Sequence, residues 1–248
     1  MRALRNGVTL TIAPAPRIAE WAWLGQLPYV KALRLQEQVR NQVADGTAAD
    51  TLLLLEHEPV ITLGRSANPA NVLASPEDLR ESGIAVVRTS RGGDVTFHGP
   101  GQVMGYPVFR LQRGIRAHVR AMGDGIVATL GSLGIAAEWR ESQPGVWVGS
   151  DKICAVGVHV RRRVAMHGFA LNVNTDLAAF RTIVPCGLRE AGVTSIAKLL
   201  GNARNLDNMD NLERIAQGLS HAFEHSFGMR MVRISASSSR LQIANENL

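Results

Sequence analysis

Arg91-Gly-Gly-Asp-Val-Thr-Phe-His-Gly-Pro-Gly-Gln102 is the stretch around which this chain is organised. Adjacent glycines permit positive φ and let another molecule approach the main chain, so the stretch predicts a shaped loop. Its free N–H groups can face a carbonyl or an anion. Apolar runs at residues 84–87 and 103–109 predict buried strands that hold the loop on either side. A long hairpin turn without function is the alternative interpretation.

Outside this stretch, strand and helix patterns follow one another without regular alternation, and strands outnumber helices. The predicted class is therefore α+β, with a mixed or antiparallel sheet and flanking helices. No change in composition marks a boundary, so we expect one domain over residues 1–234 and a loosely held polar tail over residues 235–248. Strands are expected at residues 17–26, 51–55, 59–63, 136–139, 146–148, 153–160, 164–173 and 229–234, and helices between Pro28 and Gly46, between Ser75 and Gly83, and around residues 119–133 and 212–223.

Composition limits the class of protein. The 248 residues are 46% apolar, which is enough for a sizeable core. The longest unbroken aliphatic run, Leu52 to Leu55, is far shorter than the roughly 20 apolar residues of a membrane span. No secretion signal is visible near the N-terminus, so we predict a cytoplasmic protein that does not act at a membrane. A transit peptide is the alternative, because the first nineteen residues carry arginines and no acidic residue.

The net charge of +6 predicts a surface that attracts anionic partners, which include nucleic acid, membranes and acidic proteins. Arg161-Arg-Arg163 falls between two expected strands, where it is either a solvated hairpin turn or a docking point for an acidic partner. Among the 27 basic residues, the lysines are Lys31, Lys152 and Lys198. Since arginine stays charged and lysine can give up its proton, a lysine in a chain that otherwise uses arginine is a candidate for proton transfer.

Metal and cofactor motifs are weak in this sequence. His221-Ala-Phe-Glu-His225 matches the H-x-x-E-H pattern of inverted zinc peptidases, but only Glu246 offers a further carboxylate downstream. An amphipathic helix already accounts for these residues. Gly99-Pro-Gly101 does not continue into a dinucleotide-binding motif, and nothing matches a Walker loop. We therefore predict no metal and no cofactor.

Two cysteines offer a nucleophile. Cys186 lies between proline and glycine, where a turn can present its sulfur, whereas Cys154 lies within an apolar strand pattern. An ordinary thiol has a pKa of about 8.5, so attack at neutral pH needs a nearby cation, which Lys152 can supply. The same amine can protonate a leaving thiol and later accept a proton from an amine. Sequence spacing does not show that the two side chains meet, so a surface lysine and a buried thiol remain alternatives.

Four motifs in order resemble those of the octanoyl-acyl carrier protein:protein octanoyltransferases of lipoate biosynthesis. They are Arg91–Gln102, Gly149–Ile153, His167–Asn172 and Pro185–Leu188, and the resemblance spans Trp23 to Leu200. It implies the fold shared by biotin and lipoate protein ligases, and transfer of an octanoyl or lipoyl group without ATP. The implied donor is octanoyl-acyl carrier protein. The implied acceptors are lipoyl domains of 2-oxoacid dehydrogenases and the glycine cleavage H protein.

The resemblance also implies site residues. Cys186 would carry the acyl group as a thioester, and Lys152 would act as its acid and base. Backbone N–H groups near Cys186 or in the glycine stretch are expected to hold the oxyanion. Phe97 and Arg163 depart from the pattern, which has tyrosine and an aromatic residue there, and this affects the contacts expected beside the site. The implied acyl pocket consists of Arg91, Gly92, Gly93, Asp94, Val95, Thr96, Phe97, His98, Ala155, Val156, Gly157, Gly168, Phe169 and Ala170.

Two other functions stay open at this point. An ATP-dependent lipoate or octanoate ligase of the same fold would activate the free acid as an adenylate and need no thiol. A nucleic-acid-binding module could use Arg161 to Arg163, although an aromatic content of 5% offers few platforms for base stacking.

Overall fold

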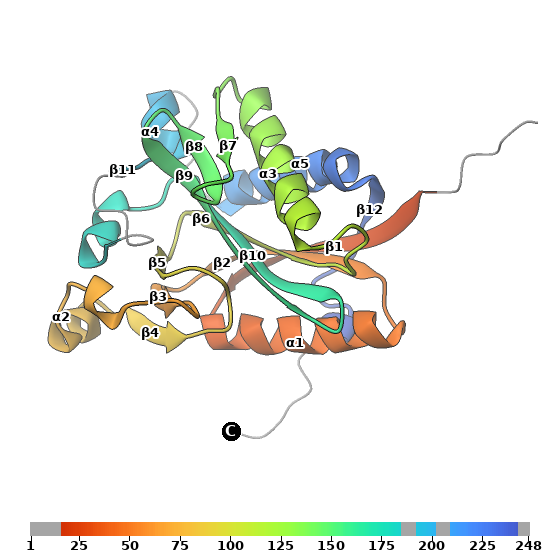
Figure 1. Cartoon of the computed structure of the whole chain (residues 1–248), viewed down its shortest axis with the longest axis horizontal. Coiled ribbons are helices and arrows are strands. Elements are labelled where there is room, and N and C mark those ends of the chain that lie inside the picture. The colour runs from red at the N-terminus through yellow and green to blue at the C-terminus, as the bar shows by residue number, and fades with distance from the viewer. Residues whose placement is uncertain (1–15, 185–191, 202–208, 243–248) are drawn as a thin grey trace, which may run out of the picture.

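A large mixed sheet lies at the centre of the computed structural model, which describes residues 16–184, 192–201 and 209–242 (Figure 1). Its strands are β1 (Arg17–Leu27), β2 (Asp50–His57), β6 (Gln102–Val108), β7 (Glu138–Arg140), β8 (Gly145–Val148), β9 (Asp151–Arg161), β10 (Val164–Asn172), β11 (Gly192–Val193) and β12 (Met229–Arg233). Within the described ranges their order is β12-β1-β2-β6-β10-β9-β8-β7, with β11 beside β9. β1 pairs in parallel with β2 and β12, as β11 does with β9, and the other pairs are antiparallel.

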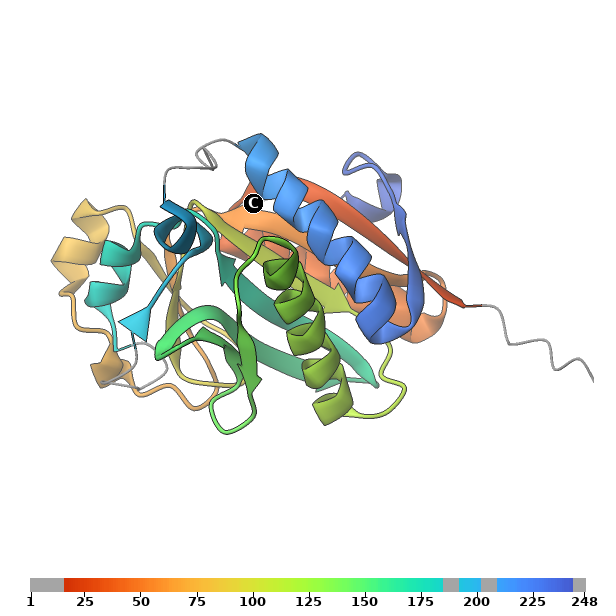
Figure 2. The same cartoon turned by 90° about the horizontal axis from the view of Figure 1, so that it is seen from above.

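Helices cover both faces of this sheet. α1 (Tyr29–Asp45) packs Leu35, Val39 and Val43 against one face, as their spacing predicted. It ends at Gly46, whose φ of 76° is the left-handed conformation that glycine adopts without strain. On the other face, α3 (Ile115–Ser132) and α5 (Met209–Phe227) lie side by side (Figure 2). The arrangement has three layers and confirms the predicted α+β class.

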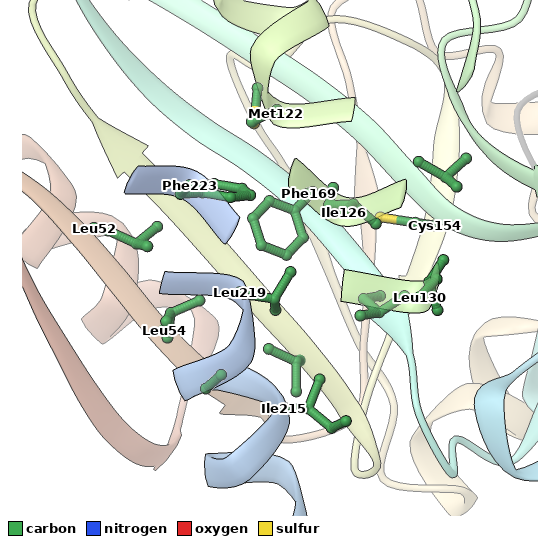
Figure 3. Packing of buried hydrophobic residues seen from close by; sticks show 14 of the residues in the cluster. Leu52, Leu54, Met122, Ile126, Leu130, Cys154, Phe169, Ile215, Leu219 and Phe223 are labelled. Atoms are coloured by element: carbon green, nitrogen blue, oxygen red, sulfur yellow. The ribbon is translucent and has the colours of Figure 1, made fainter. Parts of the chain in front are cut away.

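The core between the sheet and helices α3 and α5 includes aromatic rings from both layers (Figure 3). Phe169 of β10 lies 5.6 Å from Phe223 of α5, measured between ring centroids. Cys154 of β9 is fully buried in the same cluster, and burial raises the pKa of its thiol. The prediction that Cys154 is a small core residue is confirmed.

A second, smaller sheet corrects the prediction for residues 91–102. It consists of β3 (Val60–Leu63), β4 (Ala85–Arg88) and β5 (Val95–His98) in the order β4-β3-β5. The glycine-rich stretch is therefore not one loop, because β5 runs through it and pairs antiparallel with β3. A run of four residues with a threonine and a histidine gives little strand signal, although all four are buried. β4 forms as expected but is largely exposed rather than buried.

Short helices complete the described part of the chain. They are η1 (Pro69–Asn71), α2 (Pro76–Glu81), η2 (Leu177–Thr182), α4 (Ile196–Leu200) and η5 (Ser239–Leu241). Of these, α2 and η2 pack with the small sheet. Ser75 caps α2 as predicted: its hydroxyl accepts from the Asp78 N–H, and the Asp78 carboxylate accepts from the Ser75 N–H in return.

The tail is held more firmly than expected up to Gln242. Leu241 is buried beside α1, and the Gln38 side-chain amide donates to the carbonyl oxygens of Arg240 and Gln242 at 3.0 and 3.1 Å. Arg240 also forms an ion pair with Glu20 at 2.5 Å. One apolar residue within a serine-rich sequence is a weak signal, which explains why the sequence pattern missed this docking.

The charged motifs have structural roles. Arg162 and Arg163 form the predicted hairpin turn between β9 and β10, with φ values of 52° and 63°. His221 and His225 are exposed on α5, and the Glu224 carboxylate accepts from the Met231 N–H. The described residues contain no group of three metal-ligating side chains, and no helix among them is long and apolar enough to cross a bilayer.

Gly105→Ala tests the packing of β6 against β10. A Cβ at Gly105 would lie 2.1 Å from the Phe169 ring, so the variant should lose about 1–3 kcal/mol of unfolding free energy in urea titrations. Gly131→Ala is the control, because a Cβ there meets nothing within 4 Å and should add about 0.5–1 kcal/mol by helix propensity. Equal stabilities for the two variants would contradict this account of the packing.

Candidate active site

A cavity of about 480 Å³ lies where β9 and β10 meet the glycine-rich segment and the side chains of β5 and β6. Tyr29, Met104, Tyr106 and His167 contribute to its wall in addition to residues that the sequence singled out. The predicted site residues that line it are Arg91, Gly92, Gly93, Asp94, Thr96, His98, Lys152, Ala155, Val156, Gly157, Gly168, Phe169 and Ala170. The fold thus brings together residues from three of the four motifs.

The glycines allow the segment before β5 to lie directly on the edge of β9. The Gly92 N–H donates to the Val158 carbonyl oxygen at 3.0 Å. A Cβ at Gly157 would stand 2.8 Å from the Gly92 oxygen, so a side chain there would push the two backbones apart. The glycines therefore serve a close approach of two backbones.

Val95 and Phe97 face away from the cavity, because alternate residues of β5 point to opposite sides. Both are buried in the cluster under the small sheet, where Phe97 packs against Phe180 with ring centroids 5.6 Å apart. Phenylalanine in place of tyrosine at position 97 therefore removes no hydroxyl from the cavity wall. Arg163, the other departure from the expected pattern, lies exposed in the β9–β10 turn.

A directed chain of hydrogen bonds begins at Arg91. Its guanidinium donates to the carbonyl oxygen of Thr62 at 2.6 Å and to the Thr62 hydroxyl oxygen at 2.9 Å. The Thr62 hydroxyl in turn lies 3.1 Å from Nε2 of His98, and Nδ1 of His98 lies 3.0 Å from Oε1 of Gln102. Because an amide oxygen only accepts, Nδ1 carries the proton and Nε2 accepts from Thr62.

The chain continues through two buried amides. Nε2 of Gln102 donates to the Phe97 carbonyl oxygen at 3.2 Å and to Oδ1 of Asn172 at 2.9 Å. Nδ2 of Asn172 donates to the Thr194 carbonyl oxygen at 2.9 Å, and the Thr194 N–H donates to the Lys152 carbonyl oxygen at 3.1 Å. One network therefore connects Arg91 to the backbone of Lys152.

Sequence reasoning missed a second polar group behind the cavity. Nδ1 of His57 lies 2.8 Å from the Leu27 carbonyl oxygen, so the Tyr106 hydroxyl donates to Nε2 of His57 at 2.6 Å. The Tyr29 hydroxyl lies 3.1 Å from that of Thr89. Burial lowers the pKa of His57 to about 4, which keeps its ring neutral near pH 7. The tyrosines carried no sequence signal beyond their apolar surroundings.

His167 occupies an unusual backbone position within β10. Its φ is 57°, and its N–H donates to Oε1 of Gln36 from α1 at 2.8 Å. A non-glycine residue in this region costs free energy and persists only where its surroundings require it. Nε2 of its ring lies 3.0 Å from the Ser90 hydroxyl, and burial lowers its pKa to about 3.

Lys152 brings a cation to this cavity. Only 8% of the residue is exposed, so the alternative of a surface lysine is wrong. Its Nζ lies 4.8 Å from the centroid of the Trp147 ring, a distance that favours a cation–π contact. Val193 of β11 pairs with Lys152 in register. Cys186, the predicted nucleophile, lies outside the described residues.

These features define what the site can do. The wall is largely apolar, which suits a short alkyl chain, and a buried amine stands beside it. The three histidines near the cavity are held neutral, because burial lowers the pKa of His98 as well. Lys152 therefore adds to the wall an amine, a kind of group that can donate and accept a proton.

Comparisons with known proteins agree with this arrangement. Residues 28–220 match the lipoyl protein ligase A/B catalytic domain. An octanoyltransferase of Solibacter usitatus is 50% identical over 81% of this chain and 91% of that protein. One of Chloroflexus aurantiacus is 44% identical over 81% of this chain and 92% of that protein.

Solved structures show the fold. The bipartite lipoate protein ligase of Thermoplasma acidophilum superposes with a TM-score of 0.73 and 16% identity, over 90% of this chain and 89% of that chain. A lipoate-protein ligase A bound with ATP gives a TM-score of 0.72 and 17% identity, over 90% of this chain and 91% of that chain. The predicted ligase-like fold is confirmed.

His167→Asn tests the neutral state of His167. In the folded protein the His167 ring takes up its second proton only near pH 3. In the unfolded chain it does so near the ordinary histidine pKa of about 6.5. Wild-type stability should therefore fall relative to the variant by about 1.4 kcal/mol per pH unit below about pH 6.5. Asparagine tolerates the positive φ. Urea unfolding at pH 7, 6 and 5 measures the unfolding free energies of the wild type and the variant. If both change with pH in parallel, His167 is not held neutral by the fold.

Proposed function

Since the chain belongs to the lipoyl protein ligase A/B family, we propose that it transfers an octanoyl group from acyl carrier protein to a lysine amine of a lipoyl domain, through a thioester on Cys186 and without ATP. Its likeness to octanoyltransferases over most of its length makes it an acyltransferase of lipoate biosynthesis. We also propose that residues 1–234 act as one catalytic domain, which the family match over residues 28–220 supports.

The observation that carries the proposal is the position of Lys152 at the wall of an apolar cavity. Gly192 and Val193 pair with Asp151 and Lys152. Cys186 precedes Gly192 by six residues in the sequence, a length that spans at most about 20 Å when extended. A segment of this length permits the contact between thiol and amine that the proposal requires.

The first half of the reaction loads the protein. The Cys186 thiolate attacks the carbonyl carbon of the octanoyl thioester, and the bond from that carbon to the carrier sulfur breaks. The Lys152 ammonium gives its proton to the departing thiolate, which leaves Lys152 neutral. Before this step the same ammonium favours the thiolate form of Cys186 by opposite charge.

The second half transfers the acyl group to the acceptor. The acceptor lysine amine attacks the Cys186 thioester, and neutral Lys152 takes the proton that the amine loses. An amide forms and the Cys186 thiolate leaves, so the protein returns to its starting state. A thioester already carries the activation that an adenylate would supply, so this route needs no ATP.

The proposed partners fit the charge of the chain. Its net charge of +6 suits acidic protein partners, which increases the rate of encounter. We propose octanoyl-acyl carrier protein as donor, and as acceptors the lipoyl domains of 2-oxoacid dehydrogenases and the glycine cleavage H protein. We propose a cytoplasmic location, because a reducing compartment keeps a catalytic thiol free.

Cys186→Ala tests the thioester. The wild-type protein is mixed with octanoyl-acyl carrier protein, with no acceptor and no ATP. Its intact mass is then measured, and peptide mapping locates any adduct. An octanoyl adduct on Cys186 is expected in the wild type and none in the variant. Cys154→Ala is the control and should keep the adduct, because burial raises the pKa of that thiol. Turnover only with ATP and free octanoate would instead place the protein among the ligases.

Lys152→Ala tests the proton transfer. Loss of a general acid and base typically slows a step by about 10²–10⁴-fold, so the octanoyl adduct should form that much more slowly while Cys186 stays in place. Time-resolved intact mass gives the rate constant. If the adduct forms at the wild-type rate in Lys152→Ala, Lys152 does not take part in the loading step.

A further inference from the structure

A second, much smaller chamber of about 20 Å³ adjoins the cavity beside Lys152. Its polar wall consists of Thr96, Gln102, Lys152 and Asn172, each at least nine-tenths buried. Thr96 and Lys152 also line the large cavity, so the two spaces meet at these side chains. A space of this size holds one water molecule or one oxygen atom.

The Thr96 hydroxyl is the first donor that faces this space. Thr96 is 6% exposed, and its backbone pairs with Thr62 across β3 and β5. Its side chain has no hydrogen-bond partner among the residues that the structure describes. A hydroxyl in a cavity wall that makes no bond to the protein can donate to a molecule that occupies the cavity.

Asn172 supplies a second donor in a fixed orientation. Because Nε2 of Gln102 donates to Oδ1 of Asn172, the amide of Asn172 cannot be reversed without losing that bond. Its Nδ2 carries two N–H groups, and one of them donates to the Thr194 carbonyl oxygen. The other N–H has no acceptor among the described residues, and Asn172 lines the chamber.

Gln102 holds these groups in place without offering a donor of its own. Its two amide hydrogens go to Phe97 and Asn172, and its oxygen accepts from His98. The chamber therefore presents an O–H, an N–H and the Lys152 amine, which together suit an electron-rich oxygen.

We propose that this chamber receives the acyl carbonyl oxygen during transfer, with Thr96 and Asn172 as its hydrogen-bond donors and Gln102 as a positioning residue. The inference rests on the proposed function, in which the carbonyl carbon is attacked beside Lys152. As the carbonyl becomes tetrahedral, negative charge builds on this oxygen, and prearranged donors stabilise that charge more than the uncharged carbonyl.

Thr96→Val and Thr96→Ser form a matched pair for the test. Valine keeps the branched shape and removes the hydroxyl, whereas serine keeps the hydroxyl and removes a methyl group. The rate constant for octanoyl-Cys186 formation at saturating donor should fall about 10²–10³-fold in Thr96→Val, with KM little changed. It should stay within about tenfold of wild type in Thr96→Ser, by the same donor argument.

Unfolding measurements separate this role from a structural one. Thr96→Val should unfold at about the same temperature as the wild type, because the hydroxyl that it removes has no partner among the described residues. If Thr96→Val does not fold, Thr96→Ala, which also lacks the hydroxyl, replaces it in the rate measurement.

Two outcomes would overturn the inference. One is a folded Thr96→Val that loads octanoate at the wild-type rate, which would mean that the chamber holds only a water molecule. The other is a Thr96→Ser rate that falls as far as the Thr96→Val rate, which would mean that the methyl group matters rather than the hydroxyl. If the wild type forms no adduct, the proposed function fails instead, so the two failures are distinguishable.

Discussion

The hydrogen bond between the side-chain amides of Gln102 and Asn172 is the interaction on which the arrangement of the site depends. It joins β6 to β10 in the buried interior, and each amide passes the connection on to another segment. Gln102 fixes His98 of the small sheet, while Asn172 fixes Thr194 and, through it, the backbone of Lys152. The network therefore fixes the two sheets and the segment after residue 191 relative to one another. This arranges the groups around the Lys152 amine before substrate binds.

Burial gives the site its electrostatic character. His98 and His167 line the largely apolar cavity and His57 lies behind it, and loss of hydration disfavours the charged form of each ring. They act as neutral donors and acceptors, so positive charge at the wall is left to Arg91 and Lys152. Because these histidines are neutral, an alkyl chain that enters the cavity does not remove water from a charged imidazole.

The sequence predicted most of the helices and strands, because their apolar spacing and caps are local signals. It predicted less well where structure depends on distant partners. β5 forms because β3 lies beside it, and Leu241 is buried because apolar residues of α1 belong to the same cluster. The motifs located the cavity wall, yet Val95 and Phe97 show that a motif does not state which side of a strand faces the site.

The bond from the Gly92 N–H to the Val158 carbonyl oxygen has one more effect. β8 pairs with β9 only as far as Ala155, so the outer half of β9 is a sheet edge on that side within the described residues. An unpaired edge can pair with strands from other molecules, and Gly92 bonds to this edge at Val158. The same glycines that shape the cavity thus also cover part of a sheet edge, which is a role separate from catalysis.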